Sequence, residues 1–437
     1  MRVICVLSAL IIVSLFLVQC TADDDDLVDN TNTVNNPPNP PNNGGGNNGG
    51  GNNNGNGNNN GGNNNGGNNG NLVDDRALPL QSIDPSDNIA FPQKVELGRM
   101  LFWDPILSGG KDVACVTCHH PNFGYADGRD LSIGVGGIGL GPNRRDNSNG
   151  AFGIVPRNAP TIINTAFNGI DENGDVVPEA APMFWDLRVR SLEQQALRPT
   201  ESFVEMRGHA YSEDIAVDSI VQRLRQITGY QTLFRNVFGN TNNAINDETI
   251  AQAIAAFERS IIANDSPFDR FARGDNNAMT QQQMNGMQRF NQAGCDDCHN
   301  GPMFSDYELH VLAVPENNQL DAPDRGADNT FAFRTPTLRN LNVTGPFFHN
   351  GVANSLNDVV NFYRRISGGN NNNAGNLNPN PNVNRNQIDN DARNLNLNNN
   401  DVQAITAFLG ALNDDNFDRT IPNSVPSGLP VGGRIQN

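Results

Sequence analysis

Apolar residues recur along the chain mainly at the three- and four-residue spacing of α-helices. Pro92 can open a helix that reaches Phe102, with Leu97 and Leu101 one turn apart on its apolar side. The same spacing predicts four later helices, whose apolar positions are Ile215, Ile220, Leu224 and Ile227; Ile250, Ile254, Phe257 and Ile261; Met284, Met287 and Phe290; and, from about Asp401 onward, Ile405, Phe408, Leu409 and Leu412. Strand patterns are few and short. We therefore expect a mostly α fold with long ordered loops.

Cap residues predict where two of these helices end. Thr280 and Gln283 have the spacing of a capping box, and Gly294 can stop the helix that they open. Gly229 can likewise close the helix that contains Ile220.

Polar, Asn-rich stretches lie outside the helical pattern. From Asn30 to Asn71 the sequence is almost entirely Asn, Gly and Pro, so it lacks apolar side chains to offset its ordering entropy. A second stretch, residues 369–400, is expected to be a surface insertion. Asp265-Ser266-Pro267 breaks the helical pattern and indicates a domain boundary. The predicted organisation is a disordered tether, an N-terminal domain and a C-terminal domain, over residues 21–75, 76–265 and 266–437.

The first 20 residues have the form of a secretory signal peptide. Met1-Arg2 precedes an apolar run from Val3 to Val18, which is too short for a confident membrane span. The run ends in Leu17-Val18-Gln19-Cys20, similar to a lipoprotein processing site, so we expect Cys20 to carry lipid. Ordinary secretion with a spare thiol is the alternative, since Gln19 stands where such sites have a small residue. We expect an exported protein of the periplasm or cell envelope that meets a membrane only through this anchor.

The formal net charge of the chain is −18 at pH 7. This charge argues against nucleic acid as a partner. It would suit a basic redox partner, although acidic surfaces also serve solubility.

Four of the six cysteines lie in two copies of C-x-x-C-H, the pattern of c-type haem attachment. The copies are Cys115-Val116-Thr117-Cys118-His119 and Cys295-Asp296-Asp297-Cys298-His299. Two thiols three positions apart can each form a thioether to one haem, and the following His then lies under the ring as an axial iron ligand. A zinc site or local disulfides are the alternatives, but a site made of the four cysteines leaves both histidines unexplained. We expect two covalently bound haem c groups, one in each of two cytochrome c-like domains.

Further motifs occur between and after the two copies, in a fixed order. They are Leu101-Phe102-Trp103-Asp104-Pro105, Pro156-Arg157-Asn158-Ala159-Pro160, Phe184-Trp185-Asp186, Val204-Glu205-Met206, Asp265-Ser266-Pro267-Phe268-Asp269, Phe333-Arg334-Thr335-Pro336 and Phe348-His349-Asn350-Gly351. With both haem motifs, the chain resembles the bacterial dihaem cytochrome c peroxidase family, including its MauG-type branch. The resemblance covers roughly Leu78 to Leu412.

The resemblance implies unequal roles for the two haems. His119 would be the proximal ligand of the peroxide-reacting haem, and His299 would hold the haem that takes electrons from outside. Glu205 matches the distal acid that moves a proton between the peroxide oxygens, and Gln195 matches its companion amide. Trp185 matches the aromatic residue between the haems, although it could also be a core residue.

The resemblance also implies a calcium ion between the haems. Its ligands would be Asn158 and the backbone carbonyls of Thr344 and Pro346, which offer the hard oxygen atoms that Ca²⁺ requires.

Two positions depart from the classical peroxidases. Val135 stands where they carry a displaceable histidine, so we expect the first haem to have an open sixth position. Tyr363 stands where they carry a methionine, as in MauG-type members, and we expect it to bind the second iron. Phenolate oxygen favours ferric iron. Packing alone is the alternative role of Tyr363.

Among the remaining histidines, His120, His209 and His310 have no motif context and are expected to be surface or structural residues. His349 belongs to the family motif, with a loop-stabilising role as reasonable as a chemical one.

The resemblance predicts an enzyme that reduces hydrogen peroxide with electrons from a small redox protein, a cytochrome c or a cupredoxin. The first alternative is MauG-type oxidation of a side chain in a partner protein. The second is a plain dihaem electron-transfer cytochrome, which would need neither Glu205 with Gln195 nor an open iron.

Overall fold

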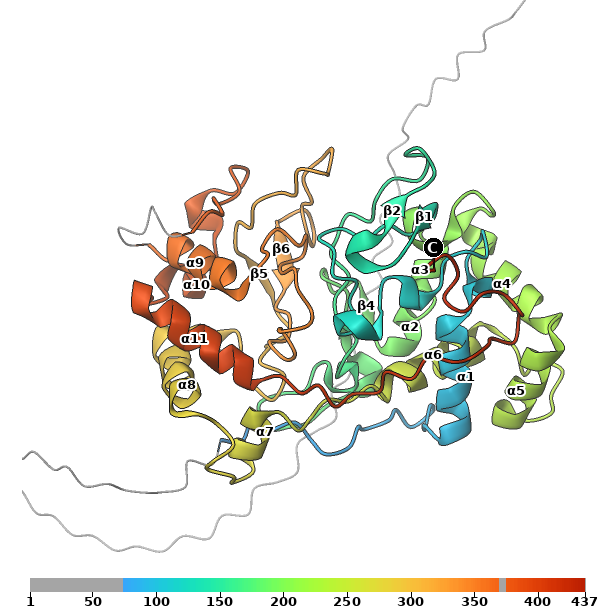
Figure 1. Cartoon of the computed structure of the whole chain (residues 1–437), viewed down its shortest axis with the longest axis horizontal. Helices are drawn as coiled ribbons and strands as arrows, with labels where there is room; N and C mark the ends of the chain where they lie inside the picture. Colours follow the sequence, from blue (N-terminus) through green and yellow to red (C-terminus); the bar gives the residue numbers. More distant parts are fainter. Residues whose placement is uncertain (1–73, 369–374, 437) are drawn as a thin grey trace, which may run out of the picture. The chain divides into compact units, whose positions relative to one another are not determined.

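The computed structural model describes residues 74–368 and 375–436, and its regular structure is mainly helical (Figure 1). The predicted signal segment, Cys20 and the tether up to residue 73 lie outside the described residues, as do residues 369–374 of the Asn-rich stretch. The described residues belong to one compact unit. Each of their helices is too short or too polar to cross a membrane.

The first group of helices is built around α1 (Pro92–Trp103) and α6 (Asp247–Arg259), which pack against each other. Pro92 opens α1, as predicted, and Leu97 and Leu101 are buried. The contact is close because Gly98 has no side chain: a Cβ at this position would lie 1.9 Å from the carbonyl oxygen of Ala253.

Two shorter helices, α4 (Ala216–Arg225) and α5 (Thr228–Phe238), complete this group. The predicted role of Gly229 is wrong, because α4 already ends at Arg225 and Gly229 lies in the first turn of α5. Ile215 precedes α4 and is exposed, whereas Ile220 and Leu224 are buried as expected.

The second group contains α8 (Gln281–Ala293), α9 (Leu356–Ile366) and α11 (Asn399–Ala411). The predicted capping box is confirmed, since the Thr280 backbone N–H donates to Gln283 Oε1 (2.8 Å) and the Gln283 N–H donates to Thr280 Oγ1 (3.3 Å). Gly294 ends α8 in the left-handed conformation, with φ of 87°. α8 and α11 lie side by side (Figure 1).

Short elements connect these helices. The remaining α-helical segments are α2 (Leu192–Gln195), α3 (Arg198–Glu201), α7 (Pro267–Ala272) and α10 (Asn390–Asn394), and η7 (Phe203–Arg207) is a π-helical turn. The 3₁₀ turns are η1 (Pro105–Leu107), η2 (Cys115–Thr117), η3 (Pro121–Phe123), η4 (Gly141–Asn143), η5 (Thr165–Phe167), η6 (Pro178–Ala180), η8 (Glu213–Ile215), η9 (Cys295–Asp297) and η10 (Arg385–Gln387). Three antiparallel pairs of short strands are β1 (Gly137–Ile138) with β2 (Arg145–Asp146), β3 (Pro182–Met183) with β4 (Val189–Arg190), and β5 (Leu309–Val311) with β6 (Ala332–Arg334).

The Asn-rich stretch is more than a surface insertion. Its apolar side chains Val383, Ile388 and Ala392 are buried in a cluster with Phe362 and Ile366 of α9. These apolar positions are scattered among many asparagines, so the sequence shows no regular apolar pattern that would predict their burial. The mostly α fold class is confirmed, with two helical groups joined by long loops.

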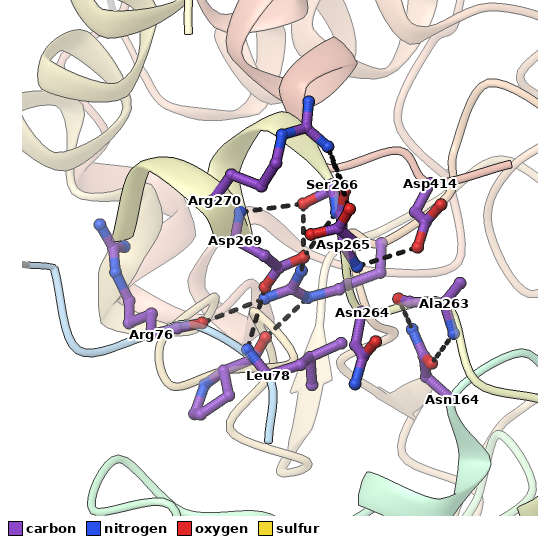
Figure 2. A network of polar contacts seen from close by, with 12 residues as sticks. Arg76, Leu78, Asn164, Ala263, Asn264, Asp265, Ser266, Asp269, Arg270 and Asp414 are labelled. Carbon is purple, nitrogen blue, oxygen red and sulfur yellow. Dashed lines mark hydrogen bonds and ion pairs between the residues drawn. The ribbon is translucent and has the colours of Figure 1, made fainter. Parts of the chain in front are cut away.

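A buried ion pair joins segments that are far apart in the sequence. Arg339 Nη1 lies 2.7 Å from Asp269 Oδ2, and their side chains are only 1% and 0% exposed. Figure 2 shows Asp269 with two of its neighbours, Ser266 and Leu78. The Leu78 N–H donates to Asp269 Oδ1 (2.9 Å), and Arg339 Nη2 donates to the carbonyl of Arg76 (3.0 Å). The pair therefore fixes the start of the described chain against α7.

We predict that Asp269→Ala lowers the free energy of unfolding by about 3–5 kcal/mol, because Arg339 is left as a buried charge without its partner. Urea unfolding of the haem-loaded protein measures this loss. Asp415→Ala is the control, since Asp415 forms an exposed pair with Arg419, and its loss should stay below about 1 kcal/mol. Equal losses in the two variants would contradict the prediction.

Candidate functional site

The two C-x-x-C-H motifs adopt the same local structure. Each begins with a 3₁₀ turn, η2 or η9. Such a turn has three residues per turn, so the two cysteines of a motif lie on one side of it. The backbone N–H of His119 donates to the Cys115 carbonyl (3.0 Å), and His299 donates to Cys295 at the same distance.

Both motif histidines are held in one orientation by the backbone. His119 Nδ1 lies 3.1 Å from the carbonyl oxygen of Tyr125, and His299 Nδ1 lies 2.8 Å from that of Phe304. A carbonyl only accepts, so Nδ1 carries the proton and Nε2 keeps its lone pair for a metal. Burial lowers the pKa of both histidines, which favours the neutral, ligating form. The residues present therefore fit two c-type haems.

The alternative uses of the cysteines find no support in the structure. The four motif cysteines form no disulfides. Within the described part of the chain, the one group of three or more His, Cys, Asp or Glu close enough to hold a metal ion is Cys298, Asp306 and His310. The four motif cysteines thus form no zinc site there.

Glu205 lies beside the first attachment turn. It belongs to η7, and the neighbouring loop around Val135 packs against it. The Val135 N–H donates to the Val204 carbonyl (3.1 Å), and a Cβ on Gly134 would lie 2.3 Å from the Glu205 carbonyl oxygen. Burial and the Asp127 carboxylate raise the pKa of the Cys118 thiol to about 12, Arg144 opposes them, and the Glu205 carboxylate adds a smaller contribution. Burial also raises the pKa of Glu205 itself, opposed by the charge of Arg188.

The loop that carries Val135 is held by Arg144, a residue that the sequence did not single out. The buried Arg144 guanidinium donates to the carbonyls of Ile133, Gly139 (2.9 Å) and Gly134 (2.7 Å). Three backbone acceptors fix the loop so that Val135 is buried beside η7. No local pattern marks such an arginine, because its partners are recognised only in the folded loop.

Gln195 is half-buried at the end of α2. α2 contacts α3, and α3 contacts η7, so Gln195 and Glu205 lie on neighbouring elements. No hydrogen bond joins their side chains in the described part of the chain, and the paired role of Gln195 stays a prediction.

Trp185 is hydrogen-bonded to the segment around Asn158. Its Nε1 donates to the Asn158 carbonyl (2.9 Å), and the Asn158 N–H donates to the His349 carbonyl (2.7 Å). All three residues line the cavity that contains His299. On the other side, the Pro160 carbonyl lies near the His119 ring. The segment 158–160 therefore connects the two sites, with Trp185 bonded to it.

His349 is buried at the centre of a stacked group. Its ring lies 3.6 Å from that of Phe333, at an interplanar angle of 9°. The Arg157 guanidinium lies over the ring of Phe333, 5.4 Å from its centroid. Arg157 also forms ion pairs with Asp186 (2.7 Å) and Asp324. Burial lowers the pKa of His349 to about 3, so the ring is neutral. The contacts indicate a role in ordering this loop.

The residues matched to calcium lie together. Asn158, Thr344 and Pro346 line one cavity. Asn158 Nδ2 donates to the Arg129 carbonyl (2.7 Å), which leaves Oδ1 as the atom available to a cation. Asn350 Oδ1 is a buried acceptor without a hydrogen-bond partner among the described residues. These oxygen atoms have the chemistry that Ca²⁺ prefers.

Tyr363 lies on α9 and lines the same mainly apolar cavity as His299. Burial is the main cause that raises the pKa of Tyr363 well above its usual range. The phenol therefore stays protonated unless a metal ion stabilises the phenolate, as ferric iron would. Tyr363 and His299 thus line one cavity, and ligation of the second iron by Tyr363 stays a prediction.

Comparisons with known proteins identify the family of the chain. Residues 92–277 match the family model described as di-haem cytochrome c peroxidase. The methylamine utilization protein MauG of Methylorubrum extorquens is 34% identical over 290 residues, which span 65% of this chain and 72% of that protein. The cytochrome c551 peroxidase of Nitrosomonas europaea is 30% identical over 357 residues, which span 80% of this chain and 87% of the relative.

A solved structure of a MauG-like protein associated with microbial copper homeostasis has a similar fold. Its TM-score is 0.60 at 25% identity, covering 77% of this chain and 95% of the other. The relatives, the family match and the two attachment turns agree, and the chain belongs to the di-haem cytochrome c peroxidase family, whose members are oxidoreductases with two haem c groups.

Proposed function

We propose that the protein is a dihaem peroxidase that reduces hydrogen peroxide to water with electrons from a small redox protein. The observation that carries this proposal is the half-buried carboxyl group of Glu205, which lies near Cys118 of the first attachment turn. An electron-transfer cytochrome has no need of an acid there. The names of the relatives, which include cytochrome c peroxidases, support the same activity.

Glu205 would act as the proton carrier of the reaction. Haem bound at Cys115 and Cys118 would supply the iron that binds peroxide. The Glu205 carboxylate would accept the proton of one peroxide oxygen and deliver it to the other, which leaves as water. Two electrons and two further protons complete the reduction to two water molecules. Val135 supplies no ligand atom, so this side of the iron would stay open to peroxide.

The second haem would be the entry point for electrons. Its attachment turn contains the acids Asp296, which is half-buried, and Asp297, which is exposed. The corresponding residues of the first turn, Val116 and Thr117, are buried. Only the second turn therefore presents an acidic surface, which would attract a basic cytochrome c or cupredoxin. Trp185 lies on the route between the two sites.

MauG-type oxidation of a partner protein is the second candidate function. Val135 and Tyr363 favour it, because both depart from the classical peroxidases, and a relative named MauG is 34% identical. Tyr363 as a ligand of the second iron would favour the oxidised state of that haem.

We further propose a Ca²⁺ ion held by Asn158 with the Thr344 and Pro346 carbonyls, supported by their place on one cavity. Export to the periplasm or cell envelope and a lipid anchor at Cys20 are proposed from the sequence of the first 20 residues.

The ferric protein should show one low-spin haem, held by His299 and Tyr363, and one high-spin haem with an open position. Tyr363→Phe should abolish the low-spin signal in electron paramagnetic resonance. Tyr307→Phe is the matched control: Tyr307 lines the same cavity but donates its hydroxyl to the Phe167 carbonyl. A low-spin signal that survives in Tyr363→Phe would reject the ligand, and two low-spin haems in the native protein would reject the open position.

Glu205→Gln should slow the reaction with peroxide by about 10²–10⁴-fold in stopped-flow spectroscopy. The native rate should fall as the pH decreases through the pKa of Glu205, because protonation removes the accepting carboxylate. Burial raises this pKa, so the fall should begin at a higher pH than for an exposed glutamate. Glu213→Gln, at an exposed position, should leave rate and pH profile unchanged.

The same experiment separates the three functions. Rapid turnover with reduced cytochrome c supports the peroxidase, and a long-lived oxidised protein with negligible turnover supports the MauG-type reaction. No reaction with peroxide would leave the plain electron-transfer cytochrome.

Asp296→Asn with Asp297→Asn should slow turnover with a basic cytochrome c by about tenfold at low salt, because the attraction that speeds encounter is reduced. The difference should shrink at high ionic strength and vanish with a small neutral reductant. The double variant Asp214→Asn with Asp218→Asn removes the same charge from exposed positions in the first helical group, and should keep native turnover. Equal effects of the two double variants would show that only net charge matters.

A further inference from the structure

His310 has no motif context in the sequence, but it lies at the second haem site. It is the central residue of β5 and pairs with Phe333 of β6. Both residues line the cavity that contains His299 and Tyr363. His310 Nδ1 lies 4.0 Å from the sulfur of Cys298.

Both ring nitrogens of His310 face carboxylates. Nε2 lies 2.9 Å from Asp306 Oδ2, and Nδ1 lies 2.8 Å from Asp389 Oδ2. Ionised carboxylate oxygens only accept hydrogen bonds, so both nitrogens carry protons and the ring is a cation. Hydrogen bonding to Asp306 is the largest of the causes that raise the pKa of His310 above its usual value. Asp306, His310 and Asp389 together carry a net charge of −1.

The two carboxylates come from separate parts of the chain. The Asp306 N–H donates to the Cys298 carbonyl (2.8 Å), so Asp306 is tied to the second attachment turn. Asp389 caps α10, with Oδ1 accepting from the Asp391 N–H (3.0 Å), and its own N–H donates to the Val311 carbonyl (2.9 Å). His310 therefore joins the attachment turn to the Asn-rich segment.

Cys298, Asp306 and His310 also have the spacing of a metal site, with ligand atoms within 4.8 Å of one another. The chemistry is against a metal ion here. A protonated imidazole has no lone pair to offer, and a thioether at Cys298 removes the thiolate.

We propose that His310 is a positioning residue of the second haem: held between Asp306 and Asp389, it fixes the attachment turn and places a positive charge beside Cys298 that raises the reduction potential of this haem. The inference rests on haem attachment at Cys295 and Cys298, which belongs to the proposed function. A charge beside a haem acts on its potential because added positive charge favours the reduced state, which carries one more electron.

Two substitutions in the haem-loaded protein test the sign of this effect. His310→Gln removes the positive charge and leaves both carboxylates, so the potential of the second haem should fall. Asp389→Asn removes a negative charge, keeps the shape of the side chain and keeps a good helix cap, so the potential should rise. Glu308→Gln is the matched control, because Glu308 is exposed on the same loop, and its shift should be smaller than either. Spectroelectrochemical titration of each haem measures the potentials.

Opposite shifts in the two variants support the proposal, because mere loosening of the structure would move both potentials in one direction. Shifts of equal sign, or shifts no larger than that of Glu308→Gln, overturn it. Should His310→Gln fail to hold haem, a rise in Asp389→Asn supports the proposal and an unchanged or lower potential overturns it. The haem content of the native protein and its reaction with peroxide test the proposed function separately. Two haems and opposite shifts without peroxide turnover would uphold the inference while rejecting the peroxidase.

Discussion

The buried ion pair of Arg339 and Asp269 lies where three separate segments of the chain meet, and the second site depends on it. Withdrawing two charges from water costs more than their attraction returns unless their remaining donors and acceptors are satisfied. Here they are: Arg339 also donates to the carbonyls of Pro302 and Arg76, and Asp269 accepts from Leu78. Pro302 lies three residues after His299, so the pair fixes the loop that follows the second attachment turn.

The two helical groups share one mode of close helix packing. In each, the helix before an attachment turn lies against a later helix through a single glycine. A Cβ on Gly98 would lie 1.9 Å from the Ala253 carbonyl oxygen, and one on Gly286 would lie 2.0 Å from that of Ala404. An alanine would force either pair of helices apart and displace the turn that follows. The two helical groups therefore have similar frameworks, although the two haem sites differ. The difference comes from the loops and from α9, which supplies Tyr363.

Local patterns in the sequence correctly predicted the elements that depend on interactions between residues close in the sequence. The Thr280 capping box, the Gly294 stop and the buried faces of α1, α6, α8 and α11 follow from residues within a few positions of one another. The errors have non-local causes. Gly229 was expected to end a helix, but α5 begins there because its aromatic residues pack on the first group. The apolar residues of the Asn-rich segment are buried only because α9 lies beside them.

The same distinction separates the parts of the candidate site. A motif specifies attachment, because cysteines and histidine must share one turn. The charge around the site cannot be deduced in this way: His310 and Asp389 are 79 residues apart, and Arg144 holds carbonyls that become neighbours only in the folded loop. Neutral, buried His349 and positively charged, half-buried His310 line the same cavity, and only His310 has a carboxylate at each ring nitrogen. Ionisation in this cavity is thus a property of tertiary structure, and it makes two similar attachment turns chemically unequal.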